Sequence, residues 1–218
     1  FRRVLFRSHK CNPISIYGKT KLKAENYIIK KSMNNFKFII FRFFNVAGSF
    51  YKKSLGETKS PPEHLVPICI RQILKNKKIT IFNNFKTKDG SGVRDYIHVE
   101  DIASAHLKGL EYLQNENCSS TEFNLGNGTG FSVQEVINIT KSLSKKEFKV
   151  DIRERRPGDS STLVASGIKS KKELKWSPRL SLNQTINLTV DWYKNYFADQ
   201  NMTNITIEQI EKYLKSQS

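Results

Sequence analysis

Residues 36–44 constrain the fold more than any other stretch of the chain. They run Phe-Lys-Phe-Ile-Ile-Phe-Arg-Phe-Phe, an aromatic and β-branched segment that is nearly free of polar residues and too short for a helix of this hydrophobicity. This pattern predicts a strand buried on both faces, as in a parallel sheet. The segment ends at Asn45 and a small Val-Ala-Gly turn. Because open α/β sheets bind ligands at the carboxyl ends of their strands, we expect a ligand near residue 45.

Strand and helix patterns alternate along the rest of the chain, which predicts an α/β fold. Helices are expected over residues 19–31, 63–75, 100–113, 132–143, 168–174 and 181–197, and short strands over residues 77–82, 93–99, 121–125 and 149–155. Capping boxes begin at Ser132 and Ser181. Residues 93–99 alternate like an edge or half-buried strand, which leaves residues 36–44 as the one segment typical of a buried central strand. We therefore expect part of a parallel sheet together with a smaller mixed α/β lobe.

Composition narrows the class of partner. The formal net charge is +17, but the lysines are spread along the whole chain, with no zinc-finger spacing and no basic block, so we expect no nucleic-acid partner and favour a small acidic ligand. No apolar run approaches the ~18 residues that span a bilayer, so no membrane partner is expected. Cys11, Cys69 and Cys118 are odd in number and scattered, which favours a reducing compartment, and we expect the cytoplasm. The four histidines form no metal-ligand set with these cysteines, so no metal is expected.

Tyr17 and Lys21 form a candidate catalytic pair. If the segment from residue 17 onward is helical, side chains at i and i+4 share one face and these two lie one turn apart. An ammonium group beside a phenol stabilises the phenolate, so Tyr17 could give and take a proton near neutral pH. An ordinary surface helix has the same spacing, and Tyr-x-x-x-Lys alone does not decide between the two interpretations.

Two phosphate-binding patterns are incomplete. Gly18-Lys19-Thr20 resembles the end of a P-loop, but Pro13 stands where that loop requires glycine. The glycines at positions 126, 128 and 130 follow a strand and precede a helix, yet the dinucleotide fingerprint needs its third glycine at position 131, which is Phe. We interpret residues 126–130 as a turn.

Taken together, the motifs resemble the extended short-chain dehydrogenase/reductase family, and within it the sugar-nucleotide 4-epimerases. The resemblance covers about residues 11–197, with the motifs in the family's order and approximate spacing. They are Asn12-Pro13-Ile14-Ser15-Ile16-Tyr17-Gly18-Lys19-Thr20-Lys21, Phe41-Arg42-Phe43-Phe44-Asn45-Val46-Ala47-Gly48, His64-Leu65-Val66-Pro67, the run from Asp89 to Asp101 around Arg94-Asp95-Tyr96-Ile97-His98-Val99, Phe123-Asn124-Leu125-Gly126-Asn127-Gly128 and Arg155-Arg156-Pro157-Gly158-Asp159.

The resemblance implies NAD as cofactor and epimerisation at C4 of a UDP-hexose, UDP-glucose or UDP-galactose, by transient oxidation to a 4-keto sugar in galactose metabolism. It implies that Tyr17 is the acid/base, that Lys21 holds the nicotinamide ribose and that Phe44 lines the cofactor. For the UDP-sugar, it implies contacts to the diphosphate and ribose from Asn45, Arg94, Arg156 and Asp159, and contacts around the uridine from His64, Leu65, Thr80 and Phe82. Hexose and N-acetylhexosamine substrates both stay open, as does a homodimer of the full-length parent.

The family's first half, with its Gly-rich turn, first strands and catalytic Ser or Thr, has no counterpart in this sequence. We therefore expect a C-terminal fragment of the NAD(P)-binding Rossmann sheet plus a substrate-binding lobe, inactive on its own. Residues 1–8 are interpreted as foreign or misread sequence and residues 9–60 as the Rossmann remnant. Residues 61–197 are mainly the substrate lobe, with some elements returning to the Rossmann domain, and residues 198–218 are a tail. The alternatives are another NAD-dependent sugar-nucleotide epimerase or dehydratase, and a non-catalytic nucleotide- or nucleic-acid-binding domain.

Overall fold

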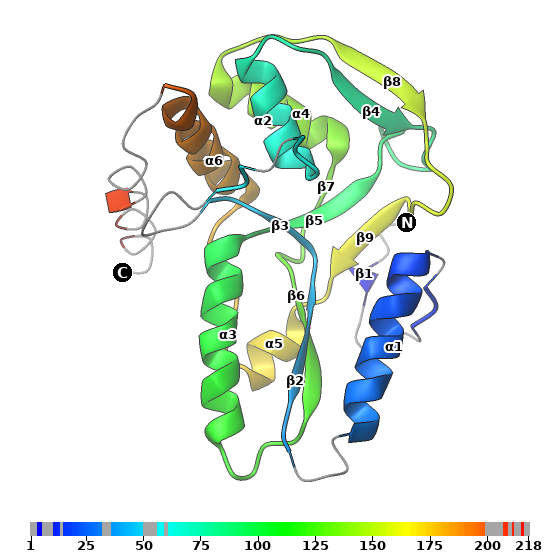
Figure 1. Ribbon diagram of the computed structural model, residues 1–218, viewed down its shortest axis with the longest axis vertical. Coiled ribbons are helices and arrows are strands. Elements are labelled where there is room, and N and C mark those ends of the chain that lie inside the picture. Colours follow the sequence, from blue (N-terminus) through cyan, green and yellow to red (C-terminus); the bar gives the residue numbers. More distant parts are fainter. Residues whose placement is uncertain are drawn as a thin grey trace.

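The computed structural model describes residues 4–5, 11–13, 15–31, 36–49, 56–58 and 61–198, together with Ile207, Glu208, Glu211 and Lys215. Its parallel strands are flanked by helices, which confirms the α/β prediction (Figure 1). The elements in chain order are β1 (Val4–Leu5), α1 (Ile16–Lys31), β2 (Ile39–Phe43), β3 (Asn45–Ala47), α2 (Leu65–Leu74), β4 (Ile79–Asn83), β5 (Val93–His98), α3 (Val99–Gln114), β6 (Thr121–Leu125), β7 (Gly130–Ser132), α4 (Val133–Ser144), β8 (Val150–Glu154), β9 (Thr162–Ala165), α5 (Ile168–Glu173) and α6 (Leu182–Phe197).

β5 is the centre of the largest sheet, whose order is β1-β9-β5-β3 with β7 also paired to β5. It runs parallel to β9 and β3 and antiparallel to β7. The prediction of an edge or half-buried strand here was wrong, because the last four residues of β5 are buried. The pattern gave the wrong prediction because β5 contains buried polar residues. Asp95 is buried, and its carboxylate accepts hydrogen bonds from the backbone N–H groups of Asn127, Gly128 and Ala165.

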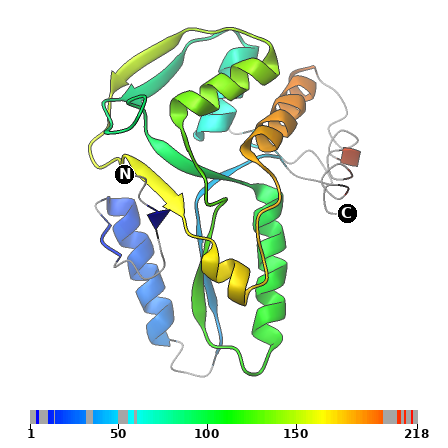
Figure 2. The ribbon, with the colours of Figure 1, turned by 180° about the vertical axis from the view of Figure 1, so that it is seen from behind.

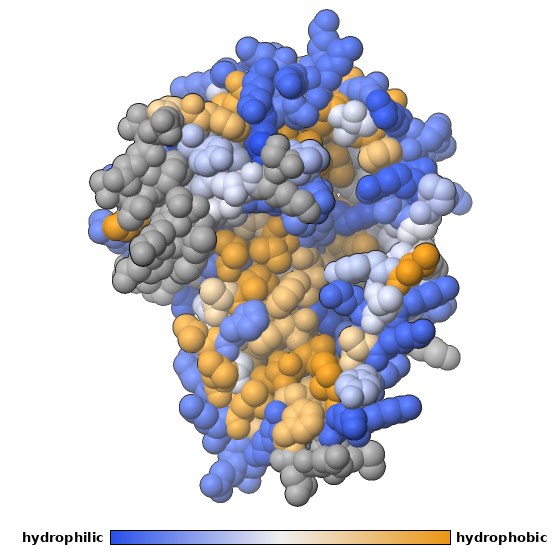
Figure 3. Space-filling view, in the orientation of Figure 1, coloured by the Kyte–Doolittle hydropathy of each residue, from blue (hydrophilic) through white to orange (hydrophobic). Residues whose placement is uncertain are grey.

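The apolar strand β2 pairs with β6 in parallel register, from Ile39 opposite Thr121 to Phe43 opposite Leu125. The parallel pairing agrees with the prediction, but the expected burial on both faces was wrong. All five residues of β2 keep some exposure, and half of the Phe43 surface is exposed. The physical reason is that, within the described residues, β2 has a neighbouring strand on one edge alone. Apolar side chains consequently gather at the surface over β2 and α3 (Figure 3).

Helices α1 and α3 lie on opposite sides of the β2–β6 pair (Figures 1 and 2). α3 contributes Ile102 and Ala105 to a core cluster that also includes Phe123 of β6. α1 differs, because none of its residues is buried and none belongs to a core cluster. The fold therefore holds α3 by packing and α1 by other contacts.

Two further clusters form the core of the second lobe. One joins α2, α4 and α6 to β3 and β5, and the other joins α2 and α4 to β4. Both predicted capping boxes are confirmed: the Ser132 hydroxyl accepts from the Glu135 N–H at 3.0 Å while the Glu135 carboxylate accepts from the Ser132 N–H at 2.7 Å, and Ser181 and Gln184 do the same at the start of α6.

Two parts of the predicted domain division involve the chain ends. Val4–Leu5 forms β1 and pairs in parallel with β9, while the interpretation of residues 1–8 as foreign sequence stays a prediction. β9 itself was not predicted, because it is short and becomes a strand through its pairing with β5 and β1. Most of the predicted tail lies outside the described residues, and the boundary at residue 60 stays a prediction.

Candidate functional site

An open cleft with a volume of about 2030 Å³ runs between the start of α1 and the second lobe. Its walls come from segments that are far apart in the sequence. They are residues 11–13 and 15, the first turns of α1, residues 42–48, Glu57, His64, Pro67, Lys86, Arg94, Val99, Asn124 and residues 158–163. The carboxyl ends of β2 and β3 thus face a cleft, as the strand pattern predicted.

Tyr17 and Lys21 line this cleft from the first turns of α1. The helix begins after Ser15, whose hydroxyl accepts from the Gly18 N–H at 3.1 Å and so caps it. Gly18 has to be small, since a Cβ there would lie 2.7 Å from the Cβ of Pro13. The Lys21 ammonium lies 5.3 Å from the centroid of the Tyr17 ring. The i, i+4 geometry is therefore formed, with the phenol largely open to the cleft.

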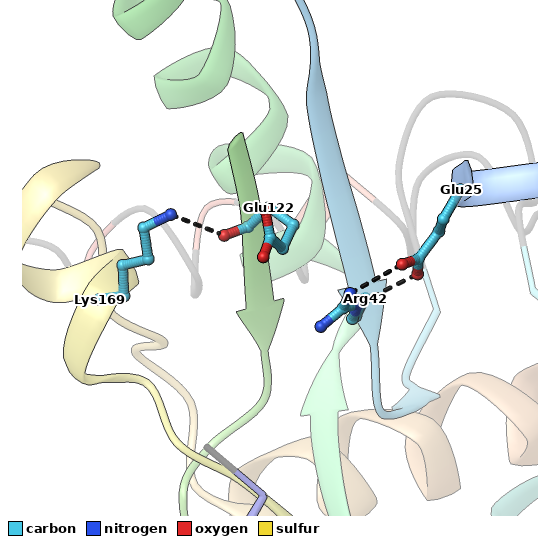
Figure 4. A network of polar contacts seen from close by, with 4 residues as sticks. All are labelled: Glu25, Arg42, Glu122 and Lys169. Carbon is cyan, nitrogen blue, oxygen red and sulfur yellow. Dashed lines mark hydrogen bonds and ion pairs between the residues drawn. The ribbon is translucent and has the colours of Figure 1, made fainter. Parts of the chain in front are cut away.

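An ion pair attaches α1 to the strand beside it (Figure 4). The Arg42 guanidinium on β2 donates from Nε and Nη2 to the Glu25 carboxylate on α1, at 3.0 and 2.7 Å. Glu25 raises the pKa of Arg42 through this hydrogen-bonded pairing. Both residues line the cleft, and sequence analysis missed them as a pair. An arginine inside an apolar strand was the available signal, because such a charge needs a partner.

Phe44 and Asn45 lie in the cleft wall where β2 gives way to β3. The backbone then turns at Gly48, which has a φ of +99°. A Cβ at this position would stand 2.4 Å from Cδ2 of His98, so both the dihedral angle and the contact require glycine. Burial lowers the pKa of His98 to about 4, and its Nδ1 accepts from the Glu100 N–H at 3.2 Å.

Arg94 reaches the cleft from the first half of β5. Its Nη1 donates to the carbonyl of Val93 at 2.8 Å, and it forms no ion pair with any acid in the described part of the chain. Burial lowers its pKa, partly countered by the charge of Asp159. Asp159 lines the cleft and pairs with Arg156 at 3.2 Å, and the Arg156 guanidinium stands over the Phe82 ring at 4.7 Å.

His64 shares the cleft wall with Glu57, a residue in a loop that no motif marks. His64 Nδ1 lies 2.6 Å from the Glu57 carboxylate. The backbone of Glu57 is held in place by Tyr193 of α6, whose hydroxyl donates to the Glu57 carbonyl at 2.5 Å. Glu57 therefore reaches the site through a tertiary contact, which the sequence alone does not reveal.

The structure brings seven of the predicted site residues together along the cleft: Tyr17, Lys21, Phe44, Asn45, His64, Arg94 and Asp159. The other four, Leu65, Thr80, Phe82 and Arg156, are not among the lining residues. Arg156 pairs with Asp159 and stands over the Phe82 ring, Leu65 begins α2 next to His64, and the Thr80 hydroxyl on β4 donates to Asp151 of β8 at 3.4 Å. Lys86 and residues 160–163 also line the cleft and were not predicted.

The described residues include no cluster of His, Cys, Asp or Glu that could hold a metal ion. No helix in this part of the chain is long and apolar enough to cross a membrane.

This fold is an α/β fold with an open cleft at the carboxyl ends of parallel strands, the position where open α/β sheets bind their ligands. Comparison with known proteins is more specific. The chain belongs to the NAD dependent epimerase/dehydratase family, which matches residues 5–126.

The relatives are longer than this chain. It is 40% identical over 189 residues to the UDP-glucose 4-epimerase of Streptococcus mutans, a match that covers 84% of this chain and 56% of that protein. The structure of UDP-glucose-4-epimerase from Stenotrophomonas maltophila with bound NAD and formylated UDP-arabinopyranose superimposes with a TM-score of 0.81 at 29% identity, covering 88% of this chain and 59% of the other. The Bifidobacterium longum UDP-glucose 4-epimerase in complex with NAD+ and UDP gives 0.79 at 27% identity, with coverages of 88% and 58%. The chain therefore spans between 56% and 59% of the length of these proteins.

Proposed function

We propose that this chain carries the proton-transfer pair and the UDP-contacting side of an NAD-dependent epimerase that acts at C4 of a UDP-hexose. The observation that carries this proposal is that Tyr17 and Lys21 of α1 line the same cleft as Arg94 of β5, which is far from them in the sequence. The relatives named above support it, since two of them were solved with NAD and a uridine nucleotide. Cytoplasmic galactose metabolism is the setting we propose for the activity, and a homodimer stays a prediction.

Tyr17 is the acid/base in this proposal. In its phenolate form it would take the proton of the sugar 4-hydroxyl as the 4-keto sugar forms, and the resulting phenol would return that proton when the 4-keto sugar is reduced on its other face. Lys21, one turn along the helix, stabilises the phenolate by its charge. NAD, when bound, supplies the hydride acceptor.

The residues present fit a nicotinamide ribose at this end of the cleft. The Lys21 ammonium makes a ring contact with Tyr17 and no ion pair within the described part of the chain, so its hydrogens are available to ribose hydroxyls. Phe44 and Asn45 lie in the same wall of the cleft and provide an apolar surface and an amide beside that position.

The charges of the cleft favour a diphosphate. Each acid in its lining has a partner: Glu25 pairs with Arg42, Asp159 pairs with Arg156, and the Glu57 carboxylate lies 2.6 Å from Nδ1 of His64. Three cations that line the cleft, Lys21, Lys86 and Arg94, have no acidic partner among the described residues. A guanidinium fork and two ammonium groups that face one cleft attract phosphate oxygens. We assign Arg94 and Asn45 to the diphosphate and Asp159, next to Arg156, to the ribose.

The proposal also assigns four residues to the uridine. Of these, His64 lines the cleft, but Leu65, Thr80 and Phe82 do not. Phe82 would act through Arg156, because its ring supports the guanidinium that pairs with Asp159. These assignments rest on the family resemblance together with the contact between Arg156 and Phe82 of β4.

The test uses a chimera in which this chain is joined to the part of the Streptococcus mutans enzyme that lies outside the match. We expect the chimera to interconvert UDP-galactose and UDP-glucose in a coupled assay with NAD, and the chain alone to be inactive. Tyr17→Phe should lower kcat by roughly two to four orders of magnitude with little change in KM, because proton transfer is lost and ground-state binding is kept.

Tyr27→Phe is the matched control. Tyr27 is on the same helix and is 64% exposed, against 72% for Tyr17, but it does not line the cleft. We expect its kcat to equal that of the unmodified chimera. Equal activity of the Tyr17→Phe chimera would show that Tyr17 is not the acid/base.

A further inference from the structure

The loop segment at residues 56–57 brings a carboxylate into the cleft wall, and helix α6 holds the segment there. The Tyr193 hydroxyl of α6 donates to the carbonyl of Glu57 at 2.5 Å. Gly56 lies against the ring of the neighbouring Trp192, since a Cβ on Gly56 would stand 2.5 Å from the Cη2 and Cζ2 atoms of that ring. Both aromatic residues are at most 1% exposed and belong to the core cluster that joins α2, α4 and α6. The backbone of Glu57 is therefore fixed to the core of the second lobe.

The two oxygens of the Glu57 carboxylate have different partners at the start of α2. Oε1 accepts from the backbone N–H of Glu63 at 3.2 Å, and Oε2 lies 2.6 Å from Nδ1 of His64. His64 directly precedes α2, and its own side chain makes no capping hydrogen bond. A carboxylate near a helix N-terminus is favoured by the unpaired N–H groups and the dipole there. Capping of α2 explains one oxygen of Glu57 and leaves the contact with His64 to be explained.

The contact with Oε2 determines which ring nitrogen of His64 stays available to a ligand. An ionised carboxylate is an acceptor only, so the hydrogen of this short bond belongs to Nδ1. The hydrogen bond at one ring nitrogen sets the tautomer of a neutral imidazole, which leaves Nε2 as an acceptor. The His64 side chain is 69% exposed and lines the cleft, whereas the Glu57 side chain is 23% exposed in the same wall. Glu57 is thus the fixed member of the pair, and His64 is the member that is open to the cleft.

We propose that Glu57 is a positioning residue that acts through His64: it fixes the orientation and the tautomer of the imidazole, so that Nε2 accepts a hydrogen bond from the nucleoside part of the bound nucleotide. This inference rests on the proposed function, in which His64 lies beside the uridine. A uracil ring and a ribose carry N–H or O–H donors that match such an acceptor, and an ionised diphosphate carries none. Glu57 therefore contributes to recognition of the nucleoside and not to binding of the phosphates.

Orientation and charge have opposite effects on ligand binding at this residue. Glu57→Gln removes a negative charge from a cleft that binds an anion, so charge alone should strengthen the binding of UDP. The same substitution weakens the hydrogen bond that orients His64, because a neutral amide is a poorer acceptor than a carboxylate. Weaker binding of UDP by this variant would consequently point to lost geometry and not to the change in charge.

The first experiment measures binding of UDP and of inorganic pyrophosphate to the full chain by calorimetry. We expect Glu57→Gln to weaken UDP binding roughly three- to tenfold and pyrophosphate binding to stay the same or to strengthen slightly. Glu147→Gln is the matched control. The Glu147 carboxylate pairs with Lys141 at 2.8 Å outside the cleft, and its substitution makes the same change in net charge. We expect this variant to bind both ligands as the unmodified chain does.

A double-mutant cycle with His64→Ala separates positioning of His64 from capping of α2. If Glu57 acts through His64, Glu57→Gln should change UDP affinity by less than about twofold once His64 is replaced by Ala. An effect that came from capping would persist in that background, because the contact with the Glu63 N–H does not involve the His64 side chain. Circular dichroism melts show whether each variant is folded before affinities are compared.

Nitrogen-15 NMR of the His64 ring gives a readout that needs no ligand. In mildly alkaline buffer, where imidazoles are neutral, we expect the hydrogen on Nδ1 in the unmodified chain and a mixture of both tautomers in Glu57→Gln. The His64→Ala variant identifies the signal, because its spectrum lacks that ring.

Four results would overturn the proposal: a hydrogen on Nε2 in the unmodified chain, UDP binding that Glu57→Gln leaves unchanged or strengthens, an equal loss of pyrophosphate binding, or an equal loss of UDP affinity in the His64→Ala background. Failure of the proposed function looks different. A chain that binds no UDP while its His64 hydrogen is on Nδ1 would count against the proposed function and against a nucleoside as the ligand, and it would leave the orientation of His64 by Glu57 intact.

Discussion

The attachment of helix α1 to β2 depends on the Glu25–Arg42 ion pair, and mutation can measure how strongly. α1 buries none of its residues, and the polar contact that attaches it to β2 in the described structure is the Glu25–Arg42 pair. Glu25→Gln removes the charge and one of the two acceptor oxygens while keeping the shape of the side chain. We expect α1 to open more often, with its other contacts unchanged.

The size of the effect follows from the geometry. A hydrogen bond to a charged group contributes about 1.5–3 kcal/mol. The two side chains are 18% and 26% exposed, so solvent screens the pair in part, and we discount its contribution to about 1–2 kcal/mol. That corresponds to a roughly 5- to 30-fold increase in the equilibrium constant for opening of α1.

Amide hydrogen exchange of peptides covering residues 16–31 measures this opening directly. The control is Glu111→Gln, which breaks the exposed Lys108–Glu111 pair on α3 and should leave exchange in α3 unchanged, because an exposed pair contributes little. Arg42→Gln combined with Glu25→Gln should add less than the sum of the two single changes. If α1 exchanged at the same rate in the Glu25→Gln variant and the unmodified chain, the conclusion that this pair holds the helix would be wrong.

Two further predictions concern binding and pH. Arg94→Ala should weaken UDP binding roughly tenfold or more, as measured by calorimetry. Arg153→Ala is the control: it removes an exposed arginine that is paired with Asp151 outside the cleft, and it should leave UDP binding unchanged. Equal losses in both variants would mean that the loss comes from the change in net charge and not from a contact made by Arg94. Burial, helped by the neighbouring Asp101, raises the pKa of Glu100 from its ordinary 4.5 to about 7. The folded state therefore holds this proton more tightly, and stability from this group falls as the pH rises through that window. Thermal melts should show a flatter pH dependence for Glu100→Gln, and parallel curves for variant and unmodified chain would refute the assignment.

Local signals predicted the helices and most of the strands. The capping boxes at Ser132 and Ser181 located the starts of α4 and α6, because the cap is a contact within four consecutive residues. The failures involve long-range contacts. β5 carries Asp95 and His98 into the core, and the backbone N–H groups that accommodate Asp95 come from the turn after β6 and from β9. No periodicity rule anticipates a buried aspartate whose partners lie in other elements.

The same distinction applies to the cleft. Tyr17, Lys21, Phe44, Asn45 and Arg94 were predicted from motifs and do line one cleft, although their roles stay proposals. Glu57 carries no motif, and it reaches the cleft because Tyr193, in a helix near the other end of the described chain, holds its carbonyl. Conversely, the family resemblance placed Thr80 and Phe82 at the ligand, and the described cleft does not include them.

The two functional parts of the cleft are stabilised by different means, and this affects how they can be lost. Arg94 belongs to β5, whose buried residues Tyr96 and Ile97 enter core clusters, so apolar burial of about 25 cal/mol per Å² holds it in place. The Tyr17 helix enters none of these clusters, and an ion pair of about 1–2 kcal/mol is a weak substitute. UDP binding through Arg94 should therefore tolerate Glu25→Gln, whereas proton transfer by Tyr17 should be weakened by it.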